Sequence, residues 1–376
     1  MKHAYLVAGL GYGDEGKGAT VDFLVRHTGA RLVVRYNGGP QAAHNVITPE
    51  GLHHTFSQFG SGTLIPETWT LLSRYMLVNP LNMLREARVL VEKGIVDALE
   101  RIAISEHSLI ITPYQVALNR LQATNSGAHT TCGQGVGQAR EDHALFKDAA
   151  VFASDLSHRG RLREKLEFNR WCCAVRGSFK HPIFEDEEIL NHTLKNYEQL
   201  ASKVWVVDDV DLLRYAATDH VIFEGAQGVL LDETYGEDSY NTWTNCTFEN
   251  AQQLLDDAGF TGTRHRLGVL RTYHTRHGDG PLSSENVSLD YPELHNNSND
   301  QYQGKFRRGT FDCDLVQQAL KIIDGVDSVA LNHLDHCEPV ADLEAVLQAP
   351  ISIRSYGPTR NNRVANLALY DMKAVV

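Results

Sequence analysis

The chain has 376 residues, of which 42% are apolar and 22% are charged, and its formal net charge is −12. These proportions are those of a soluble globular protein that can bury a sizeable core. An acidic surface repels polyanions, which excludes a broad nucleic-acid-binding face, and no uncharged apolar run reaches the ~18 residues that a transmembrane helix requires.

The N-terminal segment and the cysteines predict a cytoplasmic protein. The apolar run within Met1–Gly9 is too short for the central region of a signal peptide, and it leads into a glycine-rich turn. We therefore expect a buried first strand there. The chain has six cysteines and no CxxC pair, as expected for reduced thiols in the cytosol.

Strand-like segments recur along the chain, and amphipathic stretches of helical length lie between several of them. The predicted strands are Ala4–Ala8, Arg31–Arg35, Leu109–Ile111, Val204–Val207, His220–Phe223, Gly268–Thr272 and Ser328–Leu331. The helical stretches include Asn79–Lys93 and Asp314–Ile323. This alternation predicts an α/β fold with a mostly parallel central sheet and helices on both faces. Ligands should bind beyond the carboxyl ends of the strands.

The first strand leads into a glycine-rich loop, GYGDEGKG at Gly11–Gly18, and a helix is predicted from Ala19 to Arg26. Glycines let backbone N–H groups approach an anion, the helix N-terminus adds partial positive charge, and Lys17 adds a full charge. Gly18 stands where a Walker loop has Ser or Thr, so the usual magnesium hydroxyl is missing. Asp14 is placed to serve the metal instead. The alternative is a glycine-rich turn that binds nothing.

The hexapeptide GDEGKG at Gly13–Gly18 resembles the signature of adenylosuccinate synthetases. The resemblance implies the P-loop-like fold of that family, with Asp14 as catalytic base and Mg²⁺ ligand and Lys17 as a second catalytic residue. It further implies that the phosphate donor GTP contacts Gly13, Glu15, Gly16, Lys17 and Gly18.

A second stretch, RYNGGPQAAHN at Arg35–Asn45, resembles the family segment that ends in Asn-Ala-Gly-His-Thr. His44 falls on the catalytic acid, although a capping or core histidine is the alternative. Gln41 replaces an asparagine that contacts the nucleotide substrate. Ala43 replaces a glycine whose carbonyl reaches Mg²⁺, and Asn45 falls on a GTP contact.

A third stretch, TTCGQGVGQARED at Thr130–Asp142, resembles the family loop Thr-Thr-Gly-Arg-Gly-Ile-Gly, which holds the 5′-phosphate of the nucleotide. Cys132 is an apparent insertion, so either Thr130 or Thr131 could supply the hydroxyl. The resemblance implies a homodimer in which the partner lends an arginine shortly after this loop. Lys147 either substitutes for that arginine or the contact is lost.

Two further stretches resemble segments of the acceptor site. FEGAQGVLLD at Phe223–Asp232 resembles the family's Glu-Gly-Ala-Gln-Gly, in which the glutamine, here Gln227, is catalytic and contacts the oxygen edge of the purine; a bulged turn is the alternative. Thr242 falls on a phosphate contact. LRTYHTRHGDGP at Leu270–Pro281 resembles a strand and loop of the nucleotide pocket and contributes Arg276.

The guanine-binding segments of the family resemble VALNHLD at Val329–Asp335 and SYGP at Ser355–Pro358. A carboxylate at Asp335 pairs two acceptors with the N1–H and 2-amino donors of guanine; a helix N-cap is the alternative role. His333 replaces a lysine that flanks the base. The implied GTP contacts here are His333, Asp335, Ser355 and Gly357.

The family's aspartate-binding loop diverges most in this chain. The run of threonines that precedes the glycine in the family has no counterpart before Gly304 in the matching residues 299–312. Lys305 stands in place of the key arginine, and a lysine offers a point charge without the bidentate fork of arginine. We expect Lys305 and Arg307 to bind the carboxylate of an amine substrate, with Arg307 also contacting GTP.

The matching stretches lie in family order from Leu6 to Pro358, with weaker resemblance over 151–200, and we expect one domain over residues 1–376. The implied reaction is GTP-dependent phosphorylation of the 6-oxo group of IMP, followed by displacement by aspartate to give adenylosuccinate, GDP and phosphate. One alternative is a paralogous ligase that uses another nucleotide, such as dGMP, or another amine. The other is a non-catalytic purine-nucleotide-binding regulatory protein, against which the retained catalytic residues argue.

Overall fold

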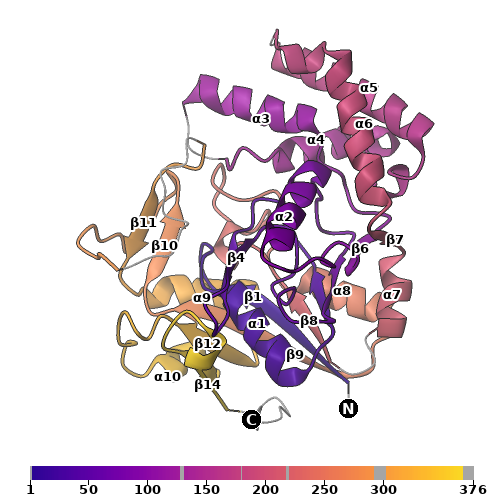
Figure 1. Cartoon of the computed structure of the whole chain (residues 1–376). Helices are drawn as coiled ribbons and strands as arrows, with labels where there is room; N and C mark the ends of the chain where they lie inside the picture. Colours follow the sequence, from indigo (N-terminus) through magenta and orange to yellow (C-terminus); the bar gives the residue numbers. More distant parts are fainter. Residues whose placement is uncertain (1, 128–130, 179, 217–219, 292–301, 367–376) are drawn as a thin grey trace.

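The computed structural model describes residues 2–127, 131–178, 180–216, 220–291 and 302–366 (Figure 1). A ten-stranded sheet in the order β14-β13-β12-β9-β1-β8-β2-β5-β6-β7 runs through the molecule. Every neighbouring pair is parallel except β13 and β14. Its strands are β1 His3–Gly9, β2 Leu32–Arg35, β5 Trp69–Leu72, β6 Ile102–Ser105, β7 Trp205–Val207, β8 His220–Glu224, β9 Thr263–Arg271, β12 Ser328–Asn332, β13 Ile351–Ser355 and β14 Arg363–Ala365.

Two antiparallel hairpins and the helices complete the described fold. The hairpins pair β3 His44–Ile47 with β4 His53–Phe56, and β10 His274–His277 with β11 Phe306–Gly309. The helices are α1 Lys17–Thr28, α2 Pro80–Glu92, α3 Pro113–Ser126, α4 Val136–Phe146, α5 Arg159–Gly177, α6 Glu187–Ala201, α7 Asp209–Ala216, α8 Glu249–Asp257, α9 Cys313–Ile322 and α10 Leu343–Leu347.

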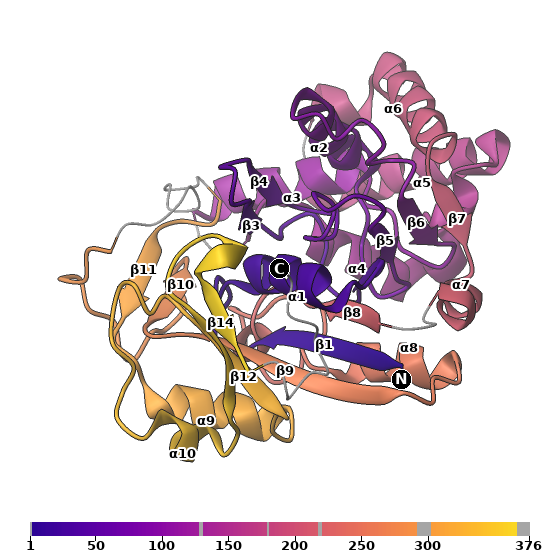
Figure 2. The ribbon, with the colours of Figure 1, turned by 60° about the horizontal axis from the view of Figure 1, so that its bottom comes forward.

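Helices cover both faces of the sheet because successive residues of the central strand point to opposite sides. Leu6 packs in one core cluster with Leu254 of α8 and Val316 of α9. The next residue, Val7, packs in another cluster with Leu24 of α1. Figure 2 shows α1 and α9 on opposite sides of β1 and β9. The predicted α/β class with a mostly parallel sheet is therefore confirmed.

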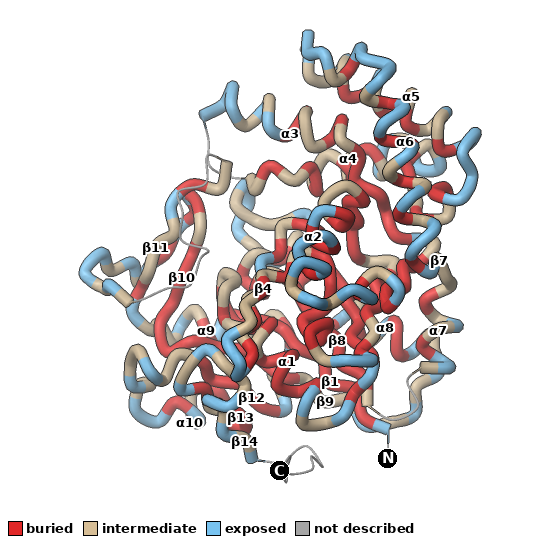
Figure 3. The backbone as a smooth tube through the Cα atoms, in the orientation of Figure 1, coloured by how far each residue is buried: buried red, intermediate tan, exposed pale blue. Residues whose placement is uncertain are grey.

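A third core cluster joins the far end of the sheet to a group of helices. It combines Leu72 of β5 and Ile104 of β6 with Leu90 of α2, Leu166 of α5 and Leu194 of α6. Much of the weakly matching stretch 151–200 thus forms α5 and α6, which pack against α3, α2 and each other within this cluster. Figure 3 shows the central strands buried and the outer surfaces of these helices partly exposed. No helix within the described ranges combines the length and apolar sequence needed to cross a bilayer.

Most predicted elements are confirmed, with shifts of a few residues at their ends. Asn79 is the N-cap of α2, where its side chain accepts hydrogen bonds from the backbone N–H groups of Leu81 and Asn82. The prediction of a strand at Leu109–Ile111 is wrong, because this stretch makes only isolated bridges and the neighbouring sheet strand is β6. Leu109 and Ile111 instead join a small cluster beside α4, and Ile110 joins the third core cluster.

Candidate active site

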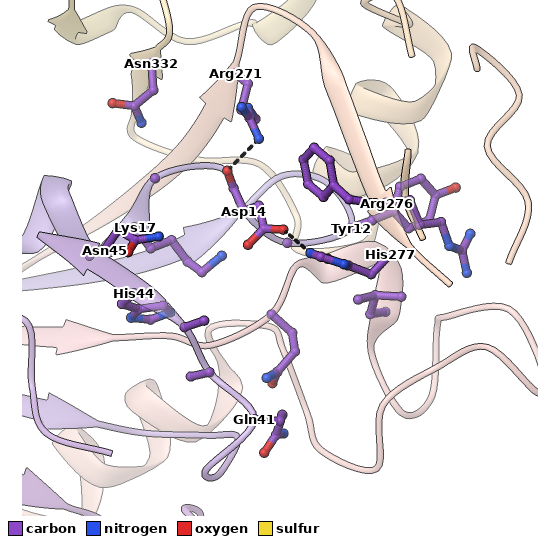
Figure 4. A pocket seen from close by; sticks show the side chains of 18 of the residues that line it. Tyr12, Asp14, Lys17, Gln41, His44, Asn45, Arg271, Arg276, His277 and Asn332 are labelled. Atoms are coloured by element: carbon purple, nitrogen blue, oxygen red, sulfur yellow. Dashed lines mark hydrogen bonds and ion pairs between the residues drawn. The ribbon is translucent and has the colours of Figure 1, made fainter. Parts of the chain in front are cut away.

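Loops that follow the central strands meet around one cavity of about 690 Å³ (Figure 4). Asp14 follows β1, Gln41 follows β2 and Gln227 follows β8, while Arg271 and Asn332 end β9 and β12. All five residues line the cavity. The cavity therefore lies at the carboxyl edge of the parallel sheet, where α/β folds bind their ligands.

The glycine-rich loop after β1 has the backbone shape of an anion site. Gly13, Asp14 and Gly16 have φ angles of 100°, 62° and 95°, in the left-handed region that favours glycine. Gly16 is the N-cap of α1, and no described side chain caps that helix end. A Cβ at Gly18 would lie 2.6 Å from Cβ of His44. The loop thus leaves the helix N-terminus available to an anion and brings His44 close to it.

Glu15 lies behind this loop and holds Lys17. Its Oε2 is 2.5 Å from Nζ of Lys17, and its Oε1 accepts a hydrogen bond of 2.8 Å from the N–H of Gly13. Both side chains are buried, but only Lys17 lines the cavity. Gly13, Gly16 and Gly18 line it as well. The predicted GTP contact of Glu15 stays a prediction, and in the structure its carboxylate fixes the loop and the lysine.

The carboxylate of Asp14 accepts a hydrogen bond from the ring of His277, with Nε2 2.9 Å from Oδ2. Arg271 donates to the backbone carbonyl of Asp14 at 3.2 Å. Burial raises the pKa of Asp14, but the hydrogen bond from His277 and the electrostatic effect of the surrounding basic side chains together hold the pKa below its ordinary value. Arg271 and Lys17 act in the same direction. Asp14 is therefore ionised at neutral pH, as a base must be.

His44 is oriented by a carboxylate from another strand. Its Nδ1 is 2.5 Å from Oε1 of Glu224, whose Oε2 accepts a hydrogen bond of 2.9 Å from the N–H of Ser61. Burial lowers the pKa of His44 despite the opposing effect of Glu224. Burial raises the pKa of Glu224, but the hydrogen bond to His44 and other contacts bring it below its ordinary value. Because Nδ1 faces Glu224, Nε2 is the nitrogen left for a ligand.

Two glutamines place unpaired amide groups in the cavity wall. Neither amide atom of Gln41 has a hydrogen-bond partner among the described residues, and the same holds for Oε1 of Gln227. Gln227 also has a φ of 58°, in the left-handed region. Buried polar groups are normally paired, so these amides are suited to hydrogen bonds with a bound ligand.

The other residues predicted for the acceptor nucleotide lie around the same space. Thr131 lines the cavity and its hydroxyl is 3.0 Å from Oδ1 of Asn119, whereas Thr130 lies outside the described residues. Thr242 and Arg276 also line the cavity. The guanidinium of Arg276 lies 4.2 Å from the ring centroid of Tyr12, a cation–π distance.

The residues predicted to bind the base of GTP also lie in the wall of this cavity. His333, Asp335, Ser355 and Gly357 all line the cavity, as does Asn45. The ring of His333 is partly buried, and its Nδ1 atom is inaccessible and has no hydrogen-bond partner among the described residues. Burial holds the pKa of His333 well below its ordinary value, so the ring is neutral.

The alternative role of Asp335 as a helix N-cap is wrong, because no described helix begins there and the chain forms a turn. Its Oδ2 lies 3.7 Å from Nε2 of His336, and the carboxylate stays in the wall of the cavity. Asp335 is therefore available to a ligand.

The two cations predicted to bind an amine do not line the cavity. Lys305 is exposed, and its backbone carbonyl accepts a hydrogen bond of 3.0 Å from Gly278. Arg307 is paired with Glu285 at 2.8 Å and also donates to the carbonyl of Gly280. Residues 292–301, which precede them, lie outside the described ranges. The assignment of Lys305 and Arg307 to an amine substrate stays a prediction.

The donor set around Asp14 fits a magnesium ion. Asp14 and Ala43 both line the cavity, and a carboxylate with a backbone carbonyl supplies the hard oxygen ligands that Mg²⁺ prefers. Mg²⁺ usually takes one or two carboxylates plus substrate phosphates, so a cluster of protein carboxylates is not required. The group of metal-ligand type found among the described residues, Glu106, His107 and Asp208, lies outside this cavity.

The sequence patterns predicted no role for Glu224, His277, Arg271 or Asn332. Glu224 opens the EGAQG run and could have been singled out as a buried acid at a strand end. The contacts of the other three depend on strands far apart in sequence. Asn332, for example, donates at 2.8 Å to the carbonyl of Glu15 and so holds the glycine-rich loop.

The fold and the cavity define an α/β enzyme with a phosphate loop that binds nucleotides. The family model for adenylosuccinate synthetase matches residues 6–347. The chain is 31% identical to adenylosuccinate synthetase of Legionella pneumophila (strain Paris), over 89% of this chain and 78% of that protein. It is 32% identical to that of Pseudomonas putida (strain W619), over 93% and 84%. The chain therefore belongs to the adenylosuccinate synthetase family, a family of ligases that form a carbon–nitrogen bond.

Two solved structures share the fold. Fully ligated adenylosuccinate synthetase of Plasmodium falciparum matches with a TM-score of 0.81 at 17% identity, over 96% of this chain and 99% of that chain. Succinoaminodeoxyadenylate synthetase of cyanophage S-2L, bound to dGMP and to dATP as an energy donor, matches with a TM-score of 0.68 at 16% identity, over 99% of each chain.

Proposed function

We propose that this ligase phosphorylates the 6-oxo group of a purine nucleotide and then joins an amine to carbon 6. The observation that carries the proposal is the convergence of Asp14, Lys17, His44 and Gln227 on one cavity. An ionised carboxylate, a cation on a phosphate loop, an oriented imidazole and an unpaired amide are the groups that this chemistry needs.

Each of these groups has a role that follows from its surroundings. The oxygen on carbon 6 is a poor leaving group until it is phosphorylated. Asp14 takes the N1 proton, so that negative charge moves to the oxygen, while the amide of Gln227 holds the oxygen edge of the base. Lys17 and the protonated form of His44 stabilise the charge on the transferred phosphoryl group. The amine then displaces phosphate from carbon 6.

Asp14 and the backbone carbonyl of Ala43 are the protein groups that would hold Mg²⁺ together with phosphate oxygens. When bound, the ion neutralises charge on the phosphates. Because Asp14 both binds the ion and acts as the general base, the orientation of its side chain is critical.

As the first candidate set of substrates we favour IMP, GTP and aspartate, which would give adenylosuccinate, GDP and phosphate as products. The position of Asp335 in the cavity wall supports a guanine donor, because a carboxylate pairs with two guanine donors and repels the acceptor edge of adenine. The relatives of about one-third identity that carry the family name support the same choice.

A second candidate within the same reaction class is a ligase for another 6-oxopurine nucleotide, such as dGMP, or for another amine. Two observations favour it. The cations expected to hold aspartate, Lys305 and Arg307, do not line the cavity, and Arg307 is already paired. A protein with the same fold was solved with dGMP and dATP.

Phosphate release over a matrix of donors, acceptors and amines tests these assignments. The donors are GTP and ATP, the acceptors IMP, GMP and dGMP, and the amines aspartate and several other amino acids, with mass spectrometry of the products. We expect release that requires all three substrates, with IMP, GTP and aspartate as the best set. A dGMP product favours the second candidate. Binding of nucleotides without turnover in any combination would support a non-catalytic regulatory protein instead.

A further inference from the structure

The carboxylate of Asp14 is held by a residue from a distant hairpin. Nε2 of His277 lies 2.9 Å from Oδ2 of Asp14 across 263 residues of sequence. Both side chains line the cavity and both are partly buried, with 17% of the His277 side chain and 27% of the Asp14 side chain exposed. Figure 4 shows the imidazole directed at the carboxylate. His277 has no role in the reaction as proposed above.

His277 is fixed by the hairpin that carries it. It is the last residue of β10 and pairs across the hairpin with Phe306, the first residue of β11. The two rings meet edge to face, with centroids 4.9 Å apart. The following residue, Gly278, donates at 3.0 Å to the carbonyl of Lys305 and closes this end of the hairpin. The imidazole therefore has packing on one side and the carboxylate on the other.

The backbone and the side chain of Asp14 are held by different residues. Arg271 donates to the carbonyl of Asp14, and the hydroxyl of Thr275 lies 3.4 Å from the carbonyl of Gly13. These contacts fix the left-handed turn at Asp14, whose φ is 62°. These backbone contacts do not restrain rotation of the Asp14 carboxylate. Among the described residues, His277 is the only hydrogen-bond partner of that carboxylate.

We propose that His277 is a positioning residue that binds Oδ2 of Asp14 and so presents Oδ1 to the purine N1–H. The proposal rests on the proposed function, in which Asp14 is the base. A carboxylate that can rotate about its side-chain bonds samples orientations in which neither oxygen faces the nucleotide. Catalytic groups must be held closely in the productive geometry, and small misplacements lower the rate strongly.

Three substitutions separate a hydrogen bond from simple packing. In His277→Gln the amide nitrogen can occupy the place of Nε2, whereas in His277→Asn the shorter side chain ends near the position of Nδ1. His277→Phe keeps the ring and its contact with Phe306 but removes the donor. Thr310→Ala, at an exposed position just after β11, is the matched control on the same hairpin.

The step to measure is phosphoryl transfer without the amine. With IMP and GTP labelled with ¹⁸O at the β,γ-bridge, reversible transfer scrambles the label, and no amine is required. We expect the exchange rate to fall about 10²-fold in His277→Phe and His277→Asn, because the carboxylate of Asp14, the general base, is no longer held in position. His277→Gln should stay within about fivefold of the wild type, with KM for both nucleotides unchanged in all three variants. The control should match the wild type.

Equal exchange in His277→Phe and wild type, or equally low exchange in His277→Gln and His277→Phe, would overturn the positioning role. If His277→Phe fails to fold, the comparison of His277→Asn with His277→Gln decides the same question. Wild-type protein that neither exchanges label nor turns over any substrate set would instead refute the proposed function.

Discussion

Oε1 of Glu224 lies 2.5 Å from Nδ1 of His44, which joins the carboxyl end of β8 to the start of β3 across 180 residues of sequence. The carboxylate is fully buried and also receives both the backbone N–H and the hydroxyl of Ser61. All of its partners are donors. A group that offers only acceptors is therefore required at this position, and it fixes which nitrogen of His44 faces the cavity.

We predict that Glu224→Gln lowers kcat by roughly 10²-fold. The amide brings an NH₂ group against donors, so the imidazole loses its fixed tautomer and orientation. The measurement is kcat in the single variants and in the double variant with His44→Ala. Because the two residues act as a unit, Glu224→Gln should add little to His44→Ala. Additive losses would mean that Glu224 does not act through His44.

The titration of His44 gives a prediction for binding. Burial keeps the pKa of His44 below the ordinary value of about 6.5 in the ligand-free protein, so the ring is neutral at pH 7. Anionic phosphates beside Nε2 stabilise the imidazolium and raise this pKa. Binding of GTP near pH 7 should therefore take up protons.

Calorimetry of GTP binding in two buffers with different ionisation enthalpies measures this proton uptake. In His44→Ala the uptake should disappear, and kcat should fall by about 10²-fold. Proton release on binding, or the same uptake in the variant, would contradict the assignment.

The donor base gives a third prediction. Asp335→Asn should raise KM for GTP while sparing the acceptor nucleotide, because the carboxylate faces the site expected for the base of the donor. An amide offers one acceptor and one donor in place of two acceptors, so preference for GTP over ATP should fall by about 10-fold, the effect of ~1.4 kcal/mol. The check is KM for GTP and ATP in both proteins. A wild type that prefers ATP would show that Asp335 does not read guanine.

The fourth prediction concerns the amine. If Lys305 binds its carboxylate, Lys305→Ala should raise the KM for aspartate severalfold and leave the KM for the acceptor nucleotide unchanged. Lys305 is exposed, so this contact should weaken strongly with salt, since charges in solvent are screened over about 10 Å at 0.1 M. Lys203→Ala, which removes a lysine far from the β10–β11 hairpin in the sequence, is the control for the loss of one positive charge. An aspartate KM that responds to neither salt nor Lys305→Ala would exclude this residue.

Local sequence determined the phosphate loop, the α/β class and the order of the site-forming stretches. The glycines at Gly13 and Gly16 adopt positive φ angles, and Gly18 allows close approach of His44, so these needs are written into a few adjacent residues. Strand periodicity is equally local. Burial is not a local property, so a short apolar run cannot by itself distinguish a strand from another buried segment. The apolar run at Leu109–Ile111 therefore predicted a strand that the sheet does not contain.

Only the tertiary structure decided which groups face each other in the cavity. The parallel pairing of β1, β2, β8 and β9 brings the segments that follow these strands together at one edge of the sheet. These segments supply the pairs His44–Glu224 and Asp14–His277. Such contacts depend on the pairing of strands far apart in sequence, which no local pattern specifies, because local patterns fix the conformation of neighbours and not the partners of their side chains.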